Sequence, residues 1–161
     1  MESLEQLSFV VWVRESGSLW GFATFLFMHT VGLATLAGVN ASIDLRLLGF
    51  ASKIPLSPLR KLFPLMWVAL ALTVFSGVVL LLTDLTAKLR TPVFSIKLIL
   101  IALAVVNLTL LYKRVFSDPH IDGKPLPANA RFLAFTSLLL WVGATTAGRL
   151  MAYLTPAGGG F

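Results

Sequence analysis

Three ionisable side chains lie inside long apolar stretches of this sequence: His29, Lys97 and Arg149. An ionisable group within hydrocarbon is costly unless it has a partner, so each is a candidate for binding or chemistry. His29 stands in FLFMHTVGLA, about ten residues from either end of its apolar run, where its ring cannot reach water. A neutral imidazole is a common ligand of metals and haem iron, and it also relays protons. The simpler interpretation is a ring that hydrogen-bonds a carbonyl or hydroxyl of a neighbouring helix.

Lys97 and Arg149 are predicted to lie at one depth, near the same membrane surface. Arg149 follows Arg131 by 18 residues, and Lys97 precedes Lys113 by 16 residues. At the helical rise these separations are about 27 and 24 Å, enough to cross most of a bilayer. Two cations converging there would suit a carboxylate, a haem propionate or a quinone oxygen. The alternative is that each side chain extends separately to the lipid headgroups.

Smaller and polar residues complete the candidate site. Gly32 lies one turn from His29 on the same helical face, where it admits either a flat ligand or a second helix. Thr145 lies one turn before Arg149, and Asn107 is a mid-span amide that needs a partner or ties helices together. We therefore expect cofactor binding by a set with His29 as metal ligand: His29, Gly32, Lys97, Asn107, Thr145 and Arg149.

The composition predicts the protein class that positions these residues. Hydrophobic residues make up 57% of the chain and charged residues only 12%, against roughly 25% charged in soluble domains. No charged residue occurs between Glu15 and Asp44 or between Lys61 and Asp84, and each gap exceeds the roughly 20 residues that span hydrocarbon. We expect one all-α integral membrane domain over residues 1–161, a four-helix transmembrane bundle with spans at about 19–39, 62–83, 93–112 and 132–154. The first span should continue as helix through SIDLRLLGF, and a short interfacial helix at about 2–14 should precede it, anchored by Trp12.

The distribution of Lys and Arg predicts the orientation. The loops after the first and third spans carry eight of these residues and the opposite side carries five. The positive-inside rule then places both termini on the periplasmic side of a bacterial inner (cytoplasmic) membrane. Glu2 and Glu5 argue against a cleavable export signal at the start of the chain. The net charge of +6 is explained by these loops and not by nucleic-acid binding.

The residue inventory limits the possible chemistry. The absence of cysteine excludes disulfides, thiolate metal sites, iron–sulfur clusters and covalently attached c-type haem. The second histidine, His120, lies in the loop DPHIDGKP and cannot reach His29. A haem at His29 would be five-coordinate, completed by an unusual group, or shared with a partner chain. The alternating trio Asp118, His120 and Asp122 is more typical of a solvated turn than of a metal site.

Four segments carry a family resemblance over nearly the whole chain: MHTVGLATLAG (28–38), IDLRLLGF (43–50), FSIKLILIALAVVN (94–107) and WVGATTAGRLMAY (141–153). With them the chain resembles a family of small four-span bacterial membrane proteins of unestablished function. It is distantly similar to the membrane domain of CopD-type copper-resistance proteins and to b-type cytochrome bundles. The resemblance gives weight to Asp44, Arg46, Lys97 and Arg149 as a set, although Asp44 would also serve simply to neutralise Arg46 or Arg60. Leu26 stands where relatives carry an acidic residue, which removes one potential partner of the imidazole.

Three functions remain open. The preferred one is a small redox module that holds haem b or a quinone and is not an enzyme on its own. The alternatives are a non-catalytic scaffold or accessory subunit of a membrane complex, and copper handling. The expected partners are the lipid bilayer and either further copies of the chain or a larger membrane complex. Soluble-type enzymes are disfavoured because no nucleophile elbow or phosphate-binding glycine loop occurs.

Overall fold

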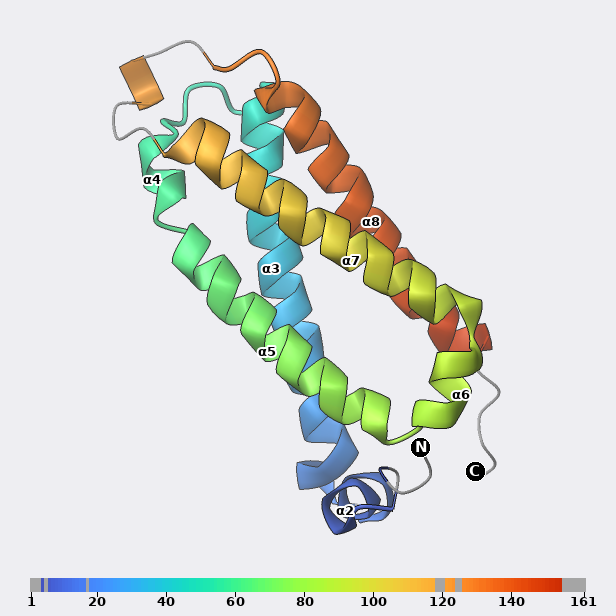
Figure 1. The fold of residues 1–161 in the computed structure, drawn as a ribbon. Helices are drawn as coiled ribbons and strands as arrows, with labels where there is room; N and C mark the ends of the chain where they lie inside the picture. Colours follow the sequence, from blue (N-terminus) through green and yellow to red (C-terminus); the bar gives the residue numbers. More distant parts are fainter. Residues whose placement is uncertain (1–3, 5, 17, 118–120, 124–125, 155–161) are drawn as a thin grey trace.

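The computed structural model describes residues 4, 6–16, 18–117, 121–123 and 126–154, and these contain four long apolar helices and no strand (Figure 1). The helices are α3 (Thr24–Leu48), α5 (Phe63–Leu82), α7 (Pro92–Leu111) and α8 (Ala130–Leu154). With their adjoining turns they give stretches at Trp20–Leu48, Ser57–Leu82, Pro92–Phe116 and Ala130–Met151 that are long and apolar enough to cross a membrane. The predicted all-α four-helix transmembrane bundle is confirmed.

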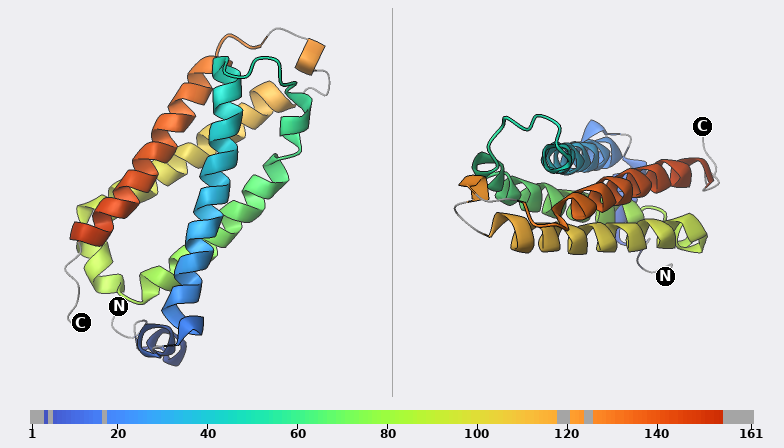
Figure 2. Two further views of the ribbon diagram at one scale, coloured as in Figure 1. Left: turned by 180° about the vertical axis from the view of Figure 1, so that it is seen from behind. Right: turned by 90° about the horizontal axis from the view of Figure 1, so that it is seen from above.

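Helix α3 is central to the packing of the bundle. It contacts α5 on one side and α8 on the other, while α7 packs against α8 (Figure 2). The buried core includes Leu36, Ile43, Leu47, Met66, Ala104, Leu108, Leu111 and Phe116. Outward-facing side chains are also large and apolar, for example Phe27, Val68 and Phe132, which are each more than half exposed. Apolar residues on both the inside and the outside are what a helix bundle in lipid requires.

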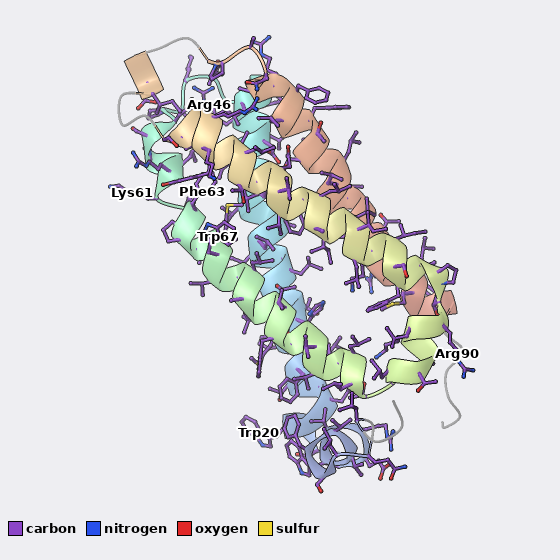
Figure 3. All side chains as sticks on the ribbon, in the orientation of Figure 1. Trp20, Arg46, Lys61, Phe63, Trp67 and Arg90 are labelled. Atoms are coloured by element: carbon purple, nitrogen blue, oxygen red, sulfur yellow. The ribbon has the colours of Figure 1, made fainter. Side chains whose placement is uncertain are left out.

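We call the end where α3 begins and α8 ends the outer end, following the orientation predicted from charge. Trp20 and Arg90 lie there, whereas Arg46 and Lys61 lie at the opposite, inner end (Figure 3). At the inner end α3 is closed by Gly49, whose φ of 108° is in the left-handed region. Gly49 donates its N–H to the Arg46 carbonyl and Phe50 donates to the Leu45 carbonyl, so the last turn of the helix is capped by a Schellman motif.

The helix of the first span runs to Leu48 as part of α3, so the helical continuation expected beyond residue 39 is present. His29 lies in the outer half of α3, where it faces Thr73 and Ser76 near the middle of α5. The depth of His29 in the bilayer stays a prediction.

A short helix, α2 (Ser8–Glu15), precedes the bundle and lies across its outer end, where it is seen end-on in Figure 1. Of its own residues, Val10 and Val13 are buried, while Phe9 and Trp12 are exposed. The segment η1 (Leu19–Ala23) joins α2 to α3 and is kinked at Gly21, whose ψ of −123° is not helical. A Cβ atom at Gly21 would lie 2.6 Å from Ser16 Oγ and 3.1 Å from the Val13 carbonyl oxygen, so glycine eases the close return of the chain here. A helix is therefore present over Ser8–Glu15 of the range 2–14 predicted for the interfacial helix. Residues 1–3 and 5 of the chain lie outside the described residues.

Short elements join the long helices. Helix α4 (Ser57–Arg60) precedes α5, α6 (Leu85–Arg90) precedes α7, η2 (Tyr112–Phe116) extends α7, and η3 (Ile121–Gly123) lies in the loop before α8. The Asp122 carboxylate accepts the backbone N–H groups of Leu56, at 2.5 Å, and of Ser57, at 3.2 Å. This contact joins the two inner-end loops.

Candidate functional site

The His29 ring is turned toward α5. Its Nδ1 atom lies 2.9 Å from the Thr73 carbonyl oxygen and 3.3 Å from Ser76 Oγ. A carbonyl oxygen can only accept, and the Ser76 hydroxyl already donates to the Leu72 carbonyl at 2.6 Å. Nδ1 therefore carries the hydrogen and donates it. In the neutral ring Nε2 is left with an unshared lone pair.

Glycines allow α3 and α5 to approach closely around this ring. A Cβ atom at Gly77 would lie 3.0 Å from His29 Cε1, so the ring packs directly against bare backbone. A Cβ atom at Gly32 would lie 2.6 Å from Thr73 Oγ1 and 3.1 Å from the Ala69 carbonyl oxygen. The space beside Gly32 is thus filled by α5. Of the two roles expected for this glycine, the structure shows helix packing.

Lys97 reaches from α7 across to α8. A Cβ atom at Gly148 would lie 3.6 Å from both Cε and Nζ of Lys97. The Lys97 charge is also close enough to His29 to act on it electrostatically. Within the part of the chain that the structure describes, Lys97 has no hydrogen bond or ion pair. Lys97 is therefore half-buried beside α8 in the outer half of the bundle, within electrostatic range of His29 but without a hydrogen bond to it.

A second lysine, Lys88, lies on α6 at the outer end of the bundle. The sequence analysis did not propose it as a site residue. Lys88 Nζ donates to the Leu80 carbonyl at 2.5 Å. Burial lowers the pKa of Lys88 from its ordinary value, and the Lys97 charge acts in the same direction while Asp84 opposes it. Two half-buried lysines, Lys88 and Lys97, therefore lie in the outer half of the bundle. In the sequence, Lys88 is an ordinary basic residue in the link between two spans, so its burial could not be predicted.

The remaining predicted residues have separate roles. Arg149 follows Gly148, so it lies at the depth of Lys97, but its side chain is exposed and forms no hydrogen bond or ion pair with the described residues. Thr145 Oγ1 donates to carbonyls of its own helix, those of Trp141 and Val142. Asn107 Nδ2 donates to the Leu133 carbonyl at 2.9 Å and so ties α7 to α8. Of the predicted set, His29 and Gly32 thus share the contact with α5 around Thr73, and the Lys97 charge acts on His29 from a distance.

A buried polar cluster joins α3 to α8 nearer the inner end. Asn40, Asp44 and Ser137 are each 0% exposed. Asn40 Nδ2 lies 2.6 Å from Asp44 Oδ2 and 2.6 Å from Ser137 Oγ. Asp44 had been noted only through the family resemblance, whereas Asn40 and Ser137 were not proposed as site residues. The available signal was the spacing of Asn40 and Asp44, four residues apart on one helical face.

The expected neutralisation of Asp44 by Arg46 or Arg60 is not seen. Arg46 Nε donates instead to the Ile54 carbonyl at 2.5 Å. Among the described residues, the single ion pair joins Arg14 to Glu15 at 2.8 Å on the surface. Asp44 is therefore buried without a cationic side chain of the described residues as its partner.

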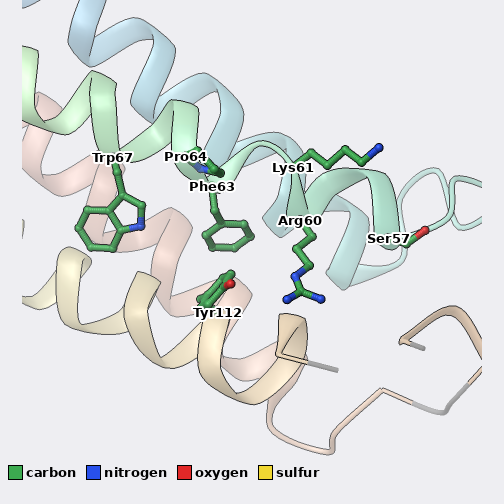
Figure 4. A pocket seen from close by; sticks show the side chains of 7 residues that line it. All are labelled: Ser57, Arg60, Lys61, Phe63, Pro64, Trp67 and Tyr112. Carbon is green, nitrogen blue, oxygen red and sulfur yellow. The ribbon is translucent and has the colours of Figure 1, made fainter. Parts of the chain in front are cut away.

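An open groove of about 610 Å³ lies between α5 and the end of α7 at the inner end. Its wall is aromatic, with the rings of Phe63 and Tyr112 4.9 Å apart, and Trp67 lies next to them. The Arg60 side chain extends toward Tyr112, whereas Lys61 extends away from it (Figure 4). The groove thus combines an apolar wall with a cation at its edge.

No group of three or more His, Cys, Asp or Glu side chains that could hold a metal ion occurs among the described residues. Asp118 and His120 of the loop trio lie outside them. No protein family model matches the chain, nor does any curated protein or solved structure. Its candidate sites therefore rest on the geometry described above.

Proposed function

We propose that this protein is a small membrane redox module in which His29 binds the iron of haem b through Nε2. One observation carries the proposal: the hydrogen bond from Nδ1 to the Thr73 carbonyl at 2.9 Å. Metal-bound histidines characteristically donate their second ring nitrogen to a carbonyl or carboxylate, which fixes the tautomer and orients the ring. The Thr73 carbonyl supplies this partner. Leu26, which stands where relatives carry an acidic residue, has no side-chain acceptor to supply it.

The donor set favours haem over a quinone. Nε2 without a hydrogen has the lone pair that iron requires, but it cannot donate to a quinone oxygen. The half-buried Lys97 ammonium, whose charge acts on His29, would pair with a propionate. Haem b supplies one-electron transfer and needs no cysteine for attachment.

One ligand position of the iron needs a further donor. His29 is the sole histidine in the part of the chain that the structure describes. The iron would be five-coordinate or would take its sixth ligand from a second copy, and we therefore include a homo-oligomer in the proposal. The membrane setting we propose is the bacterial inner membrane, with the outer end and both termini on the periplasmic side.

Absorption spectra of the purified protein test the proposal. The wild type, His29→Ala and Thr30→Ala would be expressed with added haem precursor and purified in detergent. Thr30 is the exposed neighbour of His29, so its variant controls for a small change in the same helix. We expect a b-type reduced-minus-oxidised spectrum in the wild type and Thr30→Ala, with loss of bound haem in His29→Ala that is still monodisperse and helical. A colourless wild type, or equal haem in all three proteins, contradicts the proposal.

The same hydrogen bond favours a second candidate, a scaffold in which His29 only joins α3 to α5. In that case the wild type carries no chromophore, and His29→Ala lowers thermal stability without changing any spectrum. Elemental analysis of the same samples tests the copper alternative, for which the described residues offer no multi-ligand cluster.

A further inference from the structure

The buried cluster between α3 and α8 has the composition of an ion site, separate from the His29 region. We infer that Asn40, Asp44 and Ser137 bind a sodium ion, with Trp141 holding a water molecule of its coordination shell. The inference is independent of the haem proposal, since His29 contacts α5 whereas this cluster joins α3 to α8.

The charge of Asp44 is the first argument. Its side chain is 0% exposed, and no Lys, Arg or His among the described residues forms an ion pair with it. A buried carboxylate without a compensating positive charge is strongly unfavourable. A bound cation supplies that charge. One carboxylate among otherwise neutral groups matches a monovalent ion better than a divalent one, which usually recruits more carboxylates.

The unpaired oxygens are the second argument. Asn40 Oδ1 and Asp44 Oδ1 are both buried and have no hydrogen-bond partner in the structure. Ser137 Oγ lies beside both residues and is within hydrogen-bonding reach of each. Carboxylate, amide and hydroxyl oxygens are the hard ligands that alkali and alkaline-earth ions prefer. Asn40 faces the other two residues with Nδ2, so a half-turn of its amide would place Oδ1 beside the Asp44 and Ser137 oxygens and complete a partial shell around a small ion.

The adjoining cavity is the third argument. A half-open space of about 120 Å³ between α3 and α8 is lined by Asn40, Trp141 and Thr145 among apolar side chains. It is large enough for several water molecules and adjoins Asp44 and Ser137 through Asn40. The Trp141 Nε1 atom is buried and has no partner. An indole N–H can only donate, so it would hold a water that in turn coordinates the ion.

The test measures thermal unfolding in lipid nanodiscs with equal concentrations of NaCl, KCl or choline chloride. We expect the wild type to show a saturable rise in Tm with Na⁺ that the other salts do not give. Asp44→Asn removes the charge with little change of shape and should abolish the Na⁺ response. Glu15→Gln, which removes an exposed carboxylate at the outer end, should keep it.

A second variant keeps the inference testable if Asp44→Asn does not fold. Ser137→Ala removes one oxygen and leaves the charge, so its Tm should still rise with Na⁺ but with a half-saturating concentration at least several-fold higher. Equal Tm values of the wild type in all three salts would overturn the inference. So would an infrared carbonyl band of a protonated carboxylic acid that persists in NaCl and disappears in Asp44→Asn, because Asp44 would then hold a proton.

Discussion

Replacing Gly32 by alanine tests the contact that holds His29 against α5. The added Cβ would lie 2.6 Å from Thr73 Oγ1 and 3.1 Å from the Ala69 carbonyl oxygen. The Thr73 hydroxyl donates to that carbonyl at 2.8 Å, so it cannot rotate away without losing a hydrogen bond. The two helices must therefore separate. Such overpacking typically costs about 1–3 kcal/mol of folding free energy.

Gly38 on the same helix provides the matched control. A Cβ atom there would meet no other atom within 4 Å, so Gly38→Ala keeps only the helix-propensity gain of about 1 kcal/mol. Because both substitutions bring this gain, the difference between the two variants isolates the cost of overpacking. We expect Gly32→Ala to be less stable than Gly38→Ala by about 1–3 kcal/mol.

Thermal unfolding in one detergent, followed by circular dichroism, measures this difference. For a chain of this size about 1 kcal/mol corresponds to roughly 2–4 °C in Tm. Gly32→Ala should therefore melt about 2–12 °C below Gly38→Ala. Equal melting temperatures would show that α5 does not pack against α3 at this glycine, and the described orientation of His29 would then be wrong.

Two further predictions concern the inner end. Hydrogen bonds from Ser57 and from the Leu56 backbone hold the pKa of Asp122 below its ordinary value; the stability it contributes should be complete above the ordinary carboxyl pKa of about 3.9 and be lost as pH falls through the lowered value. Asp122→Asn should remove this acid dependence in unfolding curves measured from pH 7 to pH 2, and an unchanged curve would contradict the prediction. In the basic and aromatic groove, Arg60→Ala should reduce the anionic phospholipid retained in native mass spectra more than Lys61→Ala does, because Arg60 extends toward the groove wall and Lys61 away from it (Figure 4). Equal lipid retention in the two variants would contradict that placement.

The spans could be predicted from the sequence because lipid tolerates few charged residues in a helix. Pro64 lies in the first turn of α5, where a missing backbone N–H costs no helical hydrogen bond. The helical continuation of the first span to Leu48 was expected, but the burial of Asn40 and Asp44 within it was not. They are polar but buried between helices, and a linear pattern does not distinguish this setting from an aqueous surface.

The partner of His29 could not be identified from residue types. The Thr73 carbonyl is a backbone atom, and every residue carries one. The pairing of Lys97 with Gly148 depends on which helices are neighbours, which the spacing of residues along the chain does not specify. Ser137 and Trp141 are ordinary residues in an apolar helix, and only the packing of α8 on α3 shows that their polar atoms are buried.

Nitrogen-15 NMR of histidine-labelled protein in bilayers would examine the ring itself. The chain has two histidines, so the spectrum of His29→Ala assigns the His29 signals by difference. We predict a protonated Nδ1 and an unprotonated Nε2 in the haem-free protein, with the Nε2 signal broadened or lost when haem is added. A hydrogen on Nε2, or signals that haem leaves unchanged, would contradict iron ligation by His29.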